Sequence, residues 1–243
     1  MATPAVAEGV SAAAVTALRA VLRRAHQAAE RSGRRPEAVR VVAVGKTKPV
    51  SLIRQLYDAG HRCFGENYVQ EIVEKAPQLP SDIEWHYIGH LQSNKAKSLL
   101  ASVPNLDMVQ SVDNEKVSSC WFGTQASEVL VQVNTSGEES KSGINPSNCV
   151  ELAKHVKHSC PNLIFSGLMT IGMRDYSSKP ENFLALSKCR EEVSKALDLP
   201  QEQFELSMGM SGDFEQAIEM GSTNVRIGSI IFGPREYPNR KQA

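Results

Sequence analysis

From residue 40 onward the chain alternates short apolar runs with longer amphipathic segments, and this alternation restricts its fold more than any other feature. Short apolar runs bounded by turn residues are typical of buried strands, and longer segments with apolar residues at helical spacing predict helices. The expected strands are Val41–Val44, Arg62–Phe64, Trp85–Gly89, Met108–Val112, Val129–Val133, Ile164–Met169, Glu205–Met208 and Val225–Ile227. The expected helices include Ser51–Ala59, Asn67–Ala76, Ser93–Leu100, Pro146–Lys157, Pro180–Leu197 and Asp213–Met220.

Strict alternation of strands and helices predicts parallel strands with helical crossovers, either in a closed barrel or in an open doubly wound sheet. Eight such units suit the usual length of a (β/α)8 barrel, and no expected strand is followed by the G-x-G-x-x-G fingerprint of dinucleotide-binding open sheets. We therefore predict an α/β fold with a single (β/α)8 TIM-type barrel over residues 11–237. Residues 1–10 and 238–243 are expected to be flexible ends.

The segment before the first strand predicts an extra N-terminal helix. Ser11 is its expected N-cap, and the apolar residues that follow at helical spacing are Val15, Leu18, Leu22, Ala25 and Ala29. The same segment is rich in Ala and Arg, as organelle transit peptides are, and a cleaved presequence is the less favoured interpretation.

Charge and cysteine content exclude several classes of function. The formal net charge of zero argues against nucleic-acid binding, and the absence of a long apolar run argues against a membrane span. The five cysteines are scattered without a C-x-x-C pair, which favours reduced thiols in a cytoplasmic protein. His86 and His90 lie on a strand and its exit, so zinc binding is disfavoured. Glu66 and Glu71 are expected on the first turns of a helix, as solvated or capping residues.

The candidate site comes from polar residues at strand ends, because barrel enzymes carry their active residues at the carboxyl ends of the strands. Lys46 ends an apolar strand, so its amine should point into the barrel mouth, where a lysine can form a Schiff base. A lysine that merely reaches solvent is the ordinary alternative. Ser211, Gly228 and Ser229 follow the last two strands, where glycine turns and hydroxyl groups can cradle a phosphate. Together these residues suggest a phosphorylated aldehyde as ligand.

Six motifs in order make the chain similar to one family. They are Val44–Pro49 (VGKTKP), Phe64–Glu71 (FGENYVQE), His86–Lys95 (HYIGHLQSNK), Gly167–Ile171 (GLMTI), Leu206–Ser211 (LSMGMS) and Gly221–Ser229 (GSTNVRIGS). They resemble the pyridoxal phosphate homeostasis (YggS/PROSC) family, which is related to the barrel domain of alanine racemase. The resemblance runs from about residue 10 to residue 237, and the residues within these motifs are similar to those of plant members.

The resemblance implies a ligand and a role for each site residue. The ligand is pyridoxal 5′-phosphate (PLP), and Lys46 forms a covalent aldimine with it. Arg226 matches the arginine that faces the pyridine nitrogen. Phosphate-binding positions match Ser211, Gly228 and Ser229, and pocket positions around the ring match Asn67, Ser207 and Met208.

The family resemblance further implies a binding protein of vitamin B6 homeostasis, not an enzyme, that can pass PLP to apoenzymes requiring it. An arginine at the pyridine nitrogen leaves that nitrogen unprotonated and a poor electron sink. The acid–base tyrosine that a second domain supplies in alanine racemase is expected to have no counterpart here, and without that domain we expect a monomer. The alternatives are a PLP-dependent amino-acid racemase using Tyr68 or His90 as its second base, and a phosphosugar-binding barrel without PLP.

Two features depart from the family pattern. Gly45 stands where the family usually has serine before the lysine, and the hypothesis is an altered affinity for PLP. The crossover of residues 114–128 is shorter than in the family, and Gly123 with the preceding Cys120, Trp121 and Phe122 disfavours a full helix there. A partner-binding patch formed by Trp121 and Phe122 is the less favoured interpretation of this segment.

Overall fold

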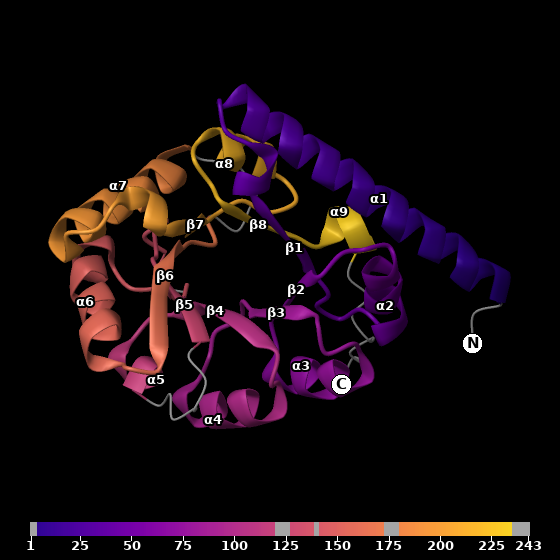
Figure 1. Cartoon of the computed structure of the whole chain (residues 1–243), viewed down its shortest axis with the longest axis horizontal. Coiled ribbons are helices and arrows are strands. Elements are labelled where there is room, and N and C mark those ends of the chain that lie inside the picture. The colour runs from indigo at the N-terminus through magenta and orange to yellow at the C-terminus, as the bar shows by residue number, and fades with distance from the viewer. Residues whose placement is uncertain (1–3, 120–126, 139–140, 173–179, 235–243) are drawn as a thin grey trace, which may run out of the picture.

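The computed structural model describes residues 4–119, 127–138, 141–172 and 180–234, and the side chains of the first helix from residue 12 onward. Its strands form a closed barrel in which each pairs in parallel with the next in sequence, and β8 pairs with β1 (Figure 1). The strands are β1 Arg40–Val44, β2 Cys63–Glu66, β3 Glu84–Tyr87, β4 Leu106–Val112, β5 Ser127–Gln132, β6 Leu163–Met169, β7 Glu205–Ser207 and β8 Asn224–Ile227. The predicted (β/α)8 barrel is confirmed, and every predicted strand is present with ends shifted by at most two residues.

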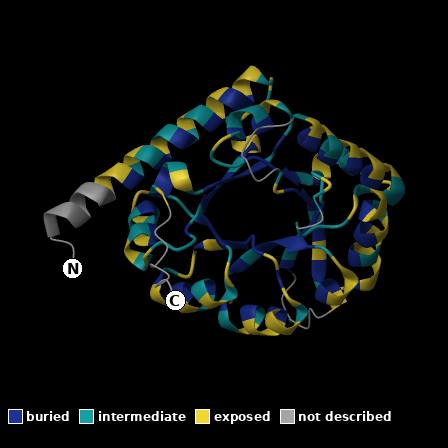
Figure 2. Ribbon diagram, turned by 180° about the vertical axis from the view of Figure 1, so that it is seen from behind, coloured by how far each residue is buried: buried dark blue, intermediate teal, exposed yellow. Residues whose placement is uncertain are grey.

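Helices surround the barrel and expose their outer faces, while the strand ring is buried (Figure 2). The α-helices are α1 Pro4–Arg31, α2 Val50–Asp58, α3 Val69–Lys75, α4 Ser93–Ser102, α5 Glu115–Ser119, α6 Cys149–Ser159, α7 Pro180–Leu197, α8 Phe214–Glu219 and α9 Ser229–Phe232. Short 3-10 helices are η1 Pro36–Ala38, η2 Ala76–Gln78, η3 Pro146–Asn148 and η4 Gln201–Gln203. The predicted helices are confirmed, with their ends shifted.

The predicted extra N-terminal helix is α1, which packs on the outside of the barrel against α8, α9 and α2 (Figure 1). Ion pairs from Arg24 to Glu215 at 2.6 Å and from Arg31 to Glu219 at 2.7 Å join it to α8. The predicted N-cap at Ser11 is wrong, because the helix begins at Pro4. Proline is favoured in the first turn of a helix and alanine within it, so the preceding residues extend the helix. The flexibility expected for residues 1–10 and 238–243 stays a prediction.

The crossover between β4 and β5 contains α5, a helix of five residues. Asn114 caps it, since its side-chain oxygen accepts a hydrogen bond from the Val117 amide at 3.0 Å. Residues 120–126, which include Trp121 and Phe122, lie outside the described residues. The barrel therefore closes with only a short described helix at this crossover.

Two buried clusters form the apolar core. The larger fills the layer between the strands and the helices, and the smaller lies inside the barrel and consists of Met108, Leu130 and Met169. Four cysteines, Cys63, Cys149, Cys160 and Cys189, are free and buried. None of the helices in the described ranges has the length and apolar character needed to cross a lipid bilayer.

Candidate cofactor site

Lys46 lies in the turn that follows β1, at the carboxyl end of the barrel strands. The Gly45 amide donates to the Gly65 carbonyl at 2.9 Å, which extends the pairing of β1 with β2 by one residue. Lys46 is half-buried, and its Nζ lies 4.6 Å from the centre of the Tyr68 ring. Nearby Lys48 is directed elsewhere, because its Nζ donates to the Pro234 carbonyl at 2.6 Å. The amine of Lys46 is thus beside the barrel mouth, next to an aromatic ring and without an anionic partner among the described residues.

Arg226 projects from β8 and is almost wholly buried, with 4% of its surface exposed. One Nη donates to the Ser207 hydroxyl, and the other donates to the Thr170 carbonyl at 2.6 Å. Burial lowers the pKa of the guanidinium to about 10, and the charge of Asp213 opposes that shift only in part. Arg226 therefore keeps its charge at neutral pH and can only donate hydrogen bonds to a ligand.

A chain of buried polar side chains continues from Arg226 through the interior of the barrel. The Ser207 hydroxyl donates to Gln110 Oε1 at 2.6 Å, and Gln110 Nε2 donates to His86 Nδ1 at 2.7 Å. His86 Nε2 in turn lies 3.2 Å from an oxygen of Asp107, near the start of β4. Such a fully bonded buried network fixes side-chain orientation, since any broken link leaves a buried polar group unpaired. The sequence interpretation missed Gln110, although a glutamine within the apolar run 108–112 was the available signal.

The three predicted phosphate-binding residues occupy two neighbouring turns. Gly228 follows β8 and precedes α9, and a Cβ on it would lie 3.5 Å from the Val44 carbonyl oxygen, so this turn adjoins the end of β1. Ser229 is the exposed first residue of α9, where the Ile231 and Phe232 amides donate to the Gly228 carbonyl and the amides of Ser229 and Ile230 have no acceptor within the helix. Ser211 is half-buried in the turn after β7. This turn is tied to β8, because the Arg226 amide donates to the Gly209 carbonyl at 3.0 Å.

Asn67 and Met208 were predicted to line the pocket around a ligand ring. Asn67 follows β2 and is half-buried, and its carbonyl accepts a hydrogen bond from the Tyr87 hydroxyl at 3.3 Å. The side chain of Met208 is fully buried in the core cluster between the barrel and the helices. Successive strand residues point to opposite faces, and Ser207 takes the inner one. For Met208, only the main chain is left to contact a ligand inside the barrel.

The expectation for Glu66 is wrong, because Glu66 is the last residue of β2, whereas Glu71 lies as expected in the first turn of α3, which begins at Val69. Glu66 is fully buried, and Lys75 Nζ donates to its Oε1 at 2.7 Å. Burial raises the pKa of Glu66 to about 7, although the charge of Lys75 opposes that shift. Lys75 also pairs with Glu71 at 2.6 Å, and the spacing of four residues between them was a signal for this pair.

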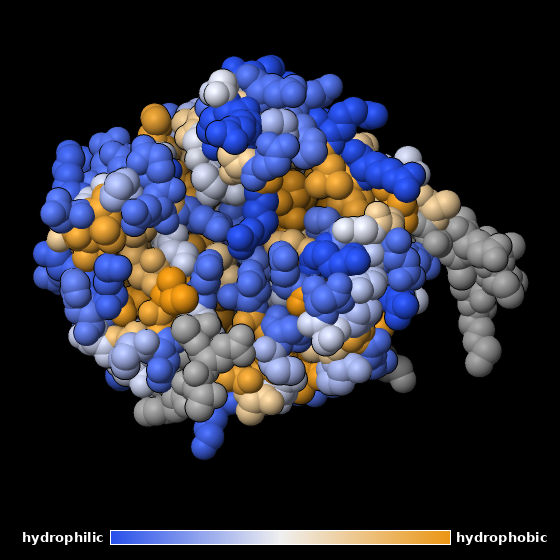
Figure 3. All heavy atoms as spheres, in the orientation of Figure 1, coloured by the Kyte–Doolittle hydropathy of each residue, from blue (hydrophilic) through white to orange (hydrophobic). Residues whose placement is uncertain are grey.

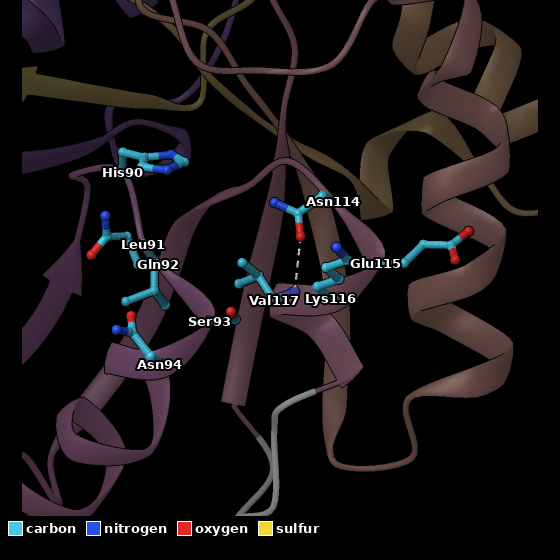
Figure 4. A pocket seen from close by; sticks show the side chains of 9 residues that line it. All are labelled: His90, Leu91, Gln92, Ser93, Asn94, Asn114, Glu115, Lys116 and Val117. Carbon is cyan, nitrogen blue, oxygen red and sulfur yellow. Dashed lines mark hydrogen bonds between the residues drawn. The ribbon is translucent and has the colours of Figure 1, made fainter.

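The surface near the mouth is hollowed, whereas Figure 3 shows the opposite end of the barrel, where the strands begin and hydrophilic side chains gather over the centre. At the mouth lies an open pocket of about 710 Å³, lined by residues 90–94 and 114–117, which follow β3 and β4 (Figure 4). A second pocket of about 420 Å³ is lined by Tyr68, His90 and neighbouring residues. His90 Nδ1 lies 3.3 Å from an oxygen of Asp113, which holds the imidazole at the rim of the barrel.

Taken together, a lysine after the first strand, a buried arginine on the eighth and glycine turns between them define a ligand-binding (β/α)8 barrel of the alanine racemase class. The family model described as alanine racemase, N-terminal domain, matches residues 15–236. The chain therefore belongs to this family.

Among curated relatives, the pyridoxal phosphate homeostasis protein of Homo sapiens is 50% identical over 241 residues, which cover 92% of this chain and 87% of that protein. The protein of the same name from Vibrio alginolyticus is 44% identical over 220 residues, which cover 86% of this chain and 91% of that protein.

Among solved structures, PipY of Synechococcus elongatus with PLP bound has a TM-score of 0.65 and 30% identity, over 88% of this chain and 100% of that one. An unknown protein from Bifidobacterium adolescentis has a TM-score of 0.83 and 34% identity, over 96% of this chain and 98% of that one. Alanine racemase of Corynebacterium glutamicum, at 13% identity and a TM-score of 0.67, shares the fold.

Proposed function

We propose that this protein binds PLP in intracellular vitamin B6 homeostasis, holding it through an imine with Lys46. The observation that carries the proposal is the placement of Lys46 and Arg226 at the carboxyl ends of adjacent strands of one barrel. The similarity to pyridoxal phosphate homeostasis proteins and to PLP-bound PipY supports the choice of ligand.

Each predicted site residue has a part in this proposal. Lys46 supplies the amine, and Arg226 supplies hydrogen-bond donors for the ring nitrogen. Ser211, Gly228 and Ser229 supply hydroxyl and main-chain donors for the phosphate, and the described residues leave both serine hydroxyls without a partner. Ser207 orients Arg226, and Asn67 and the main chain of Met208 complete the wall around the ring.

The geometry supports binding without turnover. Bound PLP supplies an aldehyde and an electron-accepting ring, and that ring accepts electrons poorly when its nitrogen faces a group that cannot give up a proton. Arg226 is such a group, since its pKa of about 10 keeps it protonated at neutral pH. A racemase would also need a base on the face opposite the lysine. Tyr68 lies against the Lys46 amine itself, and His90 is half-exposed and paired with Asp113.

Borohydride reduction of the PLP-loaded protein, followed by peptide mass mapping, tests the proposal. The adduct should map to Lys46 and should be absent in Lys46→Ala, whereas the matched control Lys48→Ala should retain it. An absorbance band of the imine that survives in Lys46→Ala would contradict the assignment, and no band in the saturated wild type would favour a phosphosugar-binding barrel.

Deuterium exchange at the Cα of L- and D-amino acids tests the racemase alternative. The binding proposal expects exchange no faster than with free PLP. Rapid exchange that depends on Tyr68 or His90 would establish a PLP-dependent racemase instead.

The proposal also includes a monomer in the cytoplasm that delivers PLP to PLP-requiring apoenzymes. The four free, buried cysteines suit a reducing compartment. Analytical ultracentrifugation of the purified protein tests the monomer, and transfer of PLP to an apoenzyme in the presence of a scavenger of free PLP tests delivery.

A further inference from the structure

A buried ion cluster lies directly behind the turn that carries Lys46. Lys75, on α3, is 8% exposed and has three acceptors within hydrogen-bond distance of its ammonium group. These are the Gly45 carbonyl at 3.0 Å, Glu66 Oε1 at 2.7 Å and Glu71 Oε2 at 2.6 Å. A lysine ammonium has three N–H donors, so all of them are used within this cluster.

The cluster forms hydrogen bonds with the backbone on both sides of Lys46. On one side, the Gly45 carbonyl accepts from Lys75. On the other side, the Thr47 amide donates to Glu71 Oε2 at 2.9 Å, the same oxygen that accepts from Lys75. The main chain before and after Lys46 is therefore bonded to two side chains of a single helix, α3.

Thr47 shows that this turn needs such support. Its φ of 62° lies in the left-handed region, which a β-branched residue seldom adopts. A residue in this region persists only where surrounding contacts hold it there. The hydrogen bond from its amide to Glu71 is such a contact. By holding Thr47, this hydrogen bond also fixes the backbone direction at the preceding residue, Lys46.

We propose that Lys75, Glu71 and Glu66 are positioning residues that fix the turn around Lys46, so that its amine is aligned with the aldehyde of the ligand. The proposal rests on the proposed function. In the reaction, the neutral Lys46 amine would form a double bond to the aldehyde carbon, and the aldehyde oxygen would leave as water with the two protons of that amine. The cluster lies outside the barrel wall and acts only through the backbone of residues 45–47.

The position of Gly45 fits this role. A Cβ on residue 45 would lie 2.9 Å from Glu66 Oε1 and 3.0 Å from Ile53 Cδ1. The serine usual in the family would thus push against the ends of these two side chains. In this chain the carboxylate of Glu66 fills the space beside Gly45, and the Lys75 ammonium bridges the two.

The test compares two ligands that differ only at the reacting carbon. PLP can bond to Lys46, whereas pyridoxine 5′-phosphate carries an alcohol there and can bind only noncovalently. Lys75→Met removes all three hydrogen bonds, and Glu71→Gln removes the charge but keeps an acceptor. Glu74→Gln is the matched control, because Glu74 is an exposed residue of the same helix.

The proposal expects Lys75→Met to weaken PLP binding about tenfold or more, which is the loss expected for charge-assisted hydrogen bonds. Affinity for pyridoxine 5′-phosphate should stay near that of the wild type. Glu71→Gln should give a smaller loss in the same direction and shift the imine absorbance band, and Glu74→Gln should change nothing. In the apoprotein, the Thr47 amide should exchange with deuterium faster in Glu71→Gln than in Glu74→Gln.

Each outcome decides the matter. Equal losses for both ligands would show that the cluster shapes the whole pocket, and unchanged affinities in both variants would show no role; either would overturn the proposal. If Lys75→Met does not fold, Glu71→Gln gives the same comparison. A wild type that forms no imine at Lys46 would overturn the proposed function itself, a result distinct from a normal wild type with unaffected variants.

Discussion

Replacement of Glu66 by glutamine should change how the stability of the protein depends on pH. Glu66 is fully buried, and its Oε2 has no hydrogen-bond partner among the described residues, while Oε1 accepts from Lys75. Burial raises its pKa from 4.5 to about 7, against the opposing charge of Lys75. Between these two values the folded protein keeps a proton that the unfolded chain has lost. The contribution of Glu66 to the free energy of unfolding therefore falls as pH rises from about 4.5 to about 7 and is constant above that range.

The size of the effect follows from the shift. One pKa unit corresponds to about 1.4 kcal/mol, so the rise to about 7 corresponds to about 3 kcal/mol. Glutamine has no proton to lose, and its side-chain oxygen can still accept from Lys75. The wild type should thus be more stable relative to Glu66→Gln at pH 5 than at pH 8, by about 3 kcal/mol.

Urea unfolding of the apoprotein, followed by circular dichroism at pH 5 and pH 8, measures this difference. Glu74→Gln, with its exposed carboxyl, provides the control and should follow the wild type at both pH values. If wild type and Glu66→Gln differ in free energy of unfolding by the same amount at both pH values, Glu66 has the same pKa in the folded and unfolded chains. If the stability of the wild type relative to Glu66→Gln increases with pH, the charge of Lys75 affects the pKa of Glu66 more than burial does.

Three further predictions concern the interior of the barrel and its packing. Gln110→Leu breaks the bonds to Ser207 and His86 and should lower the free energy of unfolding by about 2–4 kcal/mol. Urea unfolding checks this against Gln203→Leu at an exposed position, and equal losses would contradict it. Gly89→Ala would place a Cβ 1.9 Å from the Asn67 carbonyl oxygen and should cost about 3 kcal/mol or more. Gly60 has a φ of 100°, but a Cβ there would lie within 4 Å of no other atom, so Gly60→Ala should cost only about 1 kcal/mol. A lower melting temperature for Gly60→Ala than for Gly89→Ala would refute the clash. Arg226→Lys keeps a charge but loses the two-pronged guanidinium that donates to both Ser207 and Thr170. This variant should weaken PLP binding about tenfold in a titration. Unchanged affinity would show that binding does not depend on the two separate Nη donors.

Local sequence patterns were sufficient to predict the fold class and the end of the barrel that carries the candidate site. Alternation of apolar runs with amphipathic segments depends only on local spacing, and eight parallel strands with helical crossovers close in a small number of ways. Lys46 and Arg226 could be placed for the same reason, because one ends an apolar strand and the other lies within one. The helix start at Ser11 could not be fixed, since alanine and proline before it also suit a helix.

The grouping of the buried polar residues followed only from the folded arrangement of the chain. Glu66 and Glu71 were both expected to be solvated or capping residues on the first turns of a helix. Glu66 is instead wholly buried, because β2 ends two residues later than predicted and pairs with β3 as far as Glu66. Lys75 reaches the Gly45 carbonyl across thirty residues of sequence. The link from Arg226 through Ser207 to Gln110 joins three strands. Such contacts depend on strand register and on closure of the barrel, which bring together residues whose local patterns carry no information about one another.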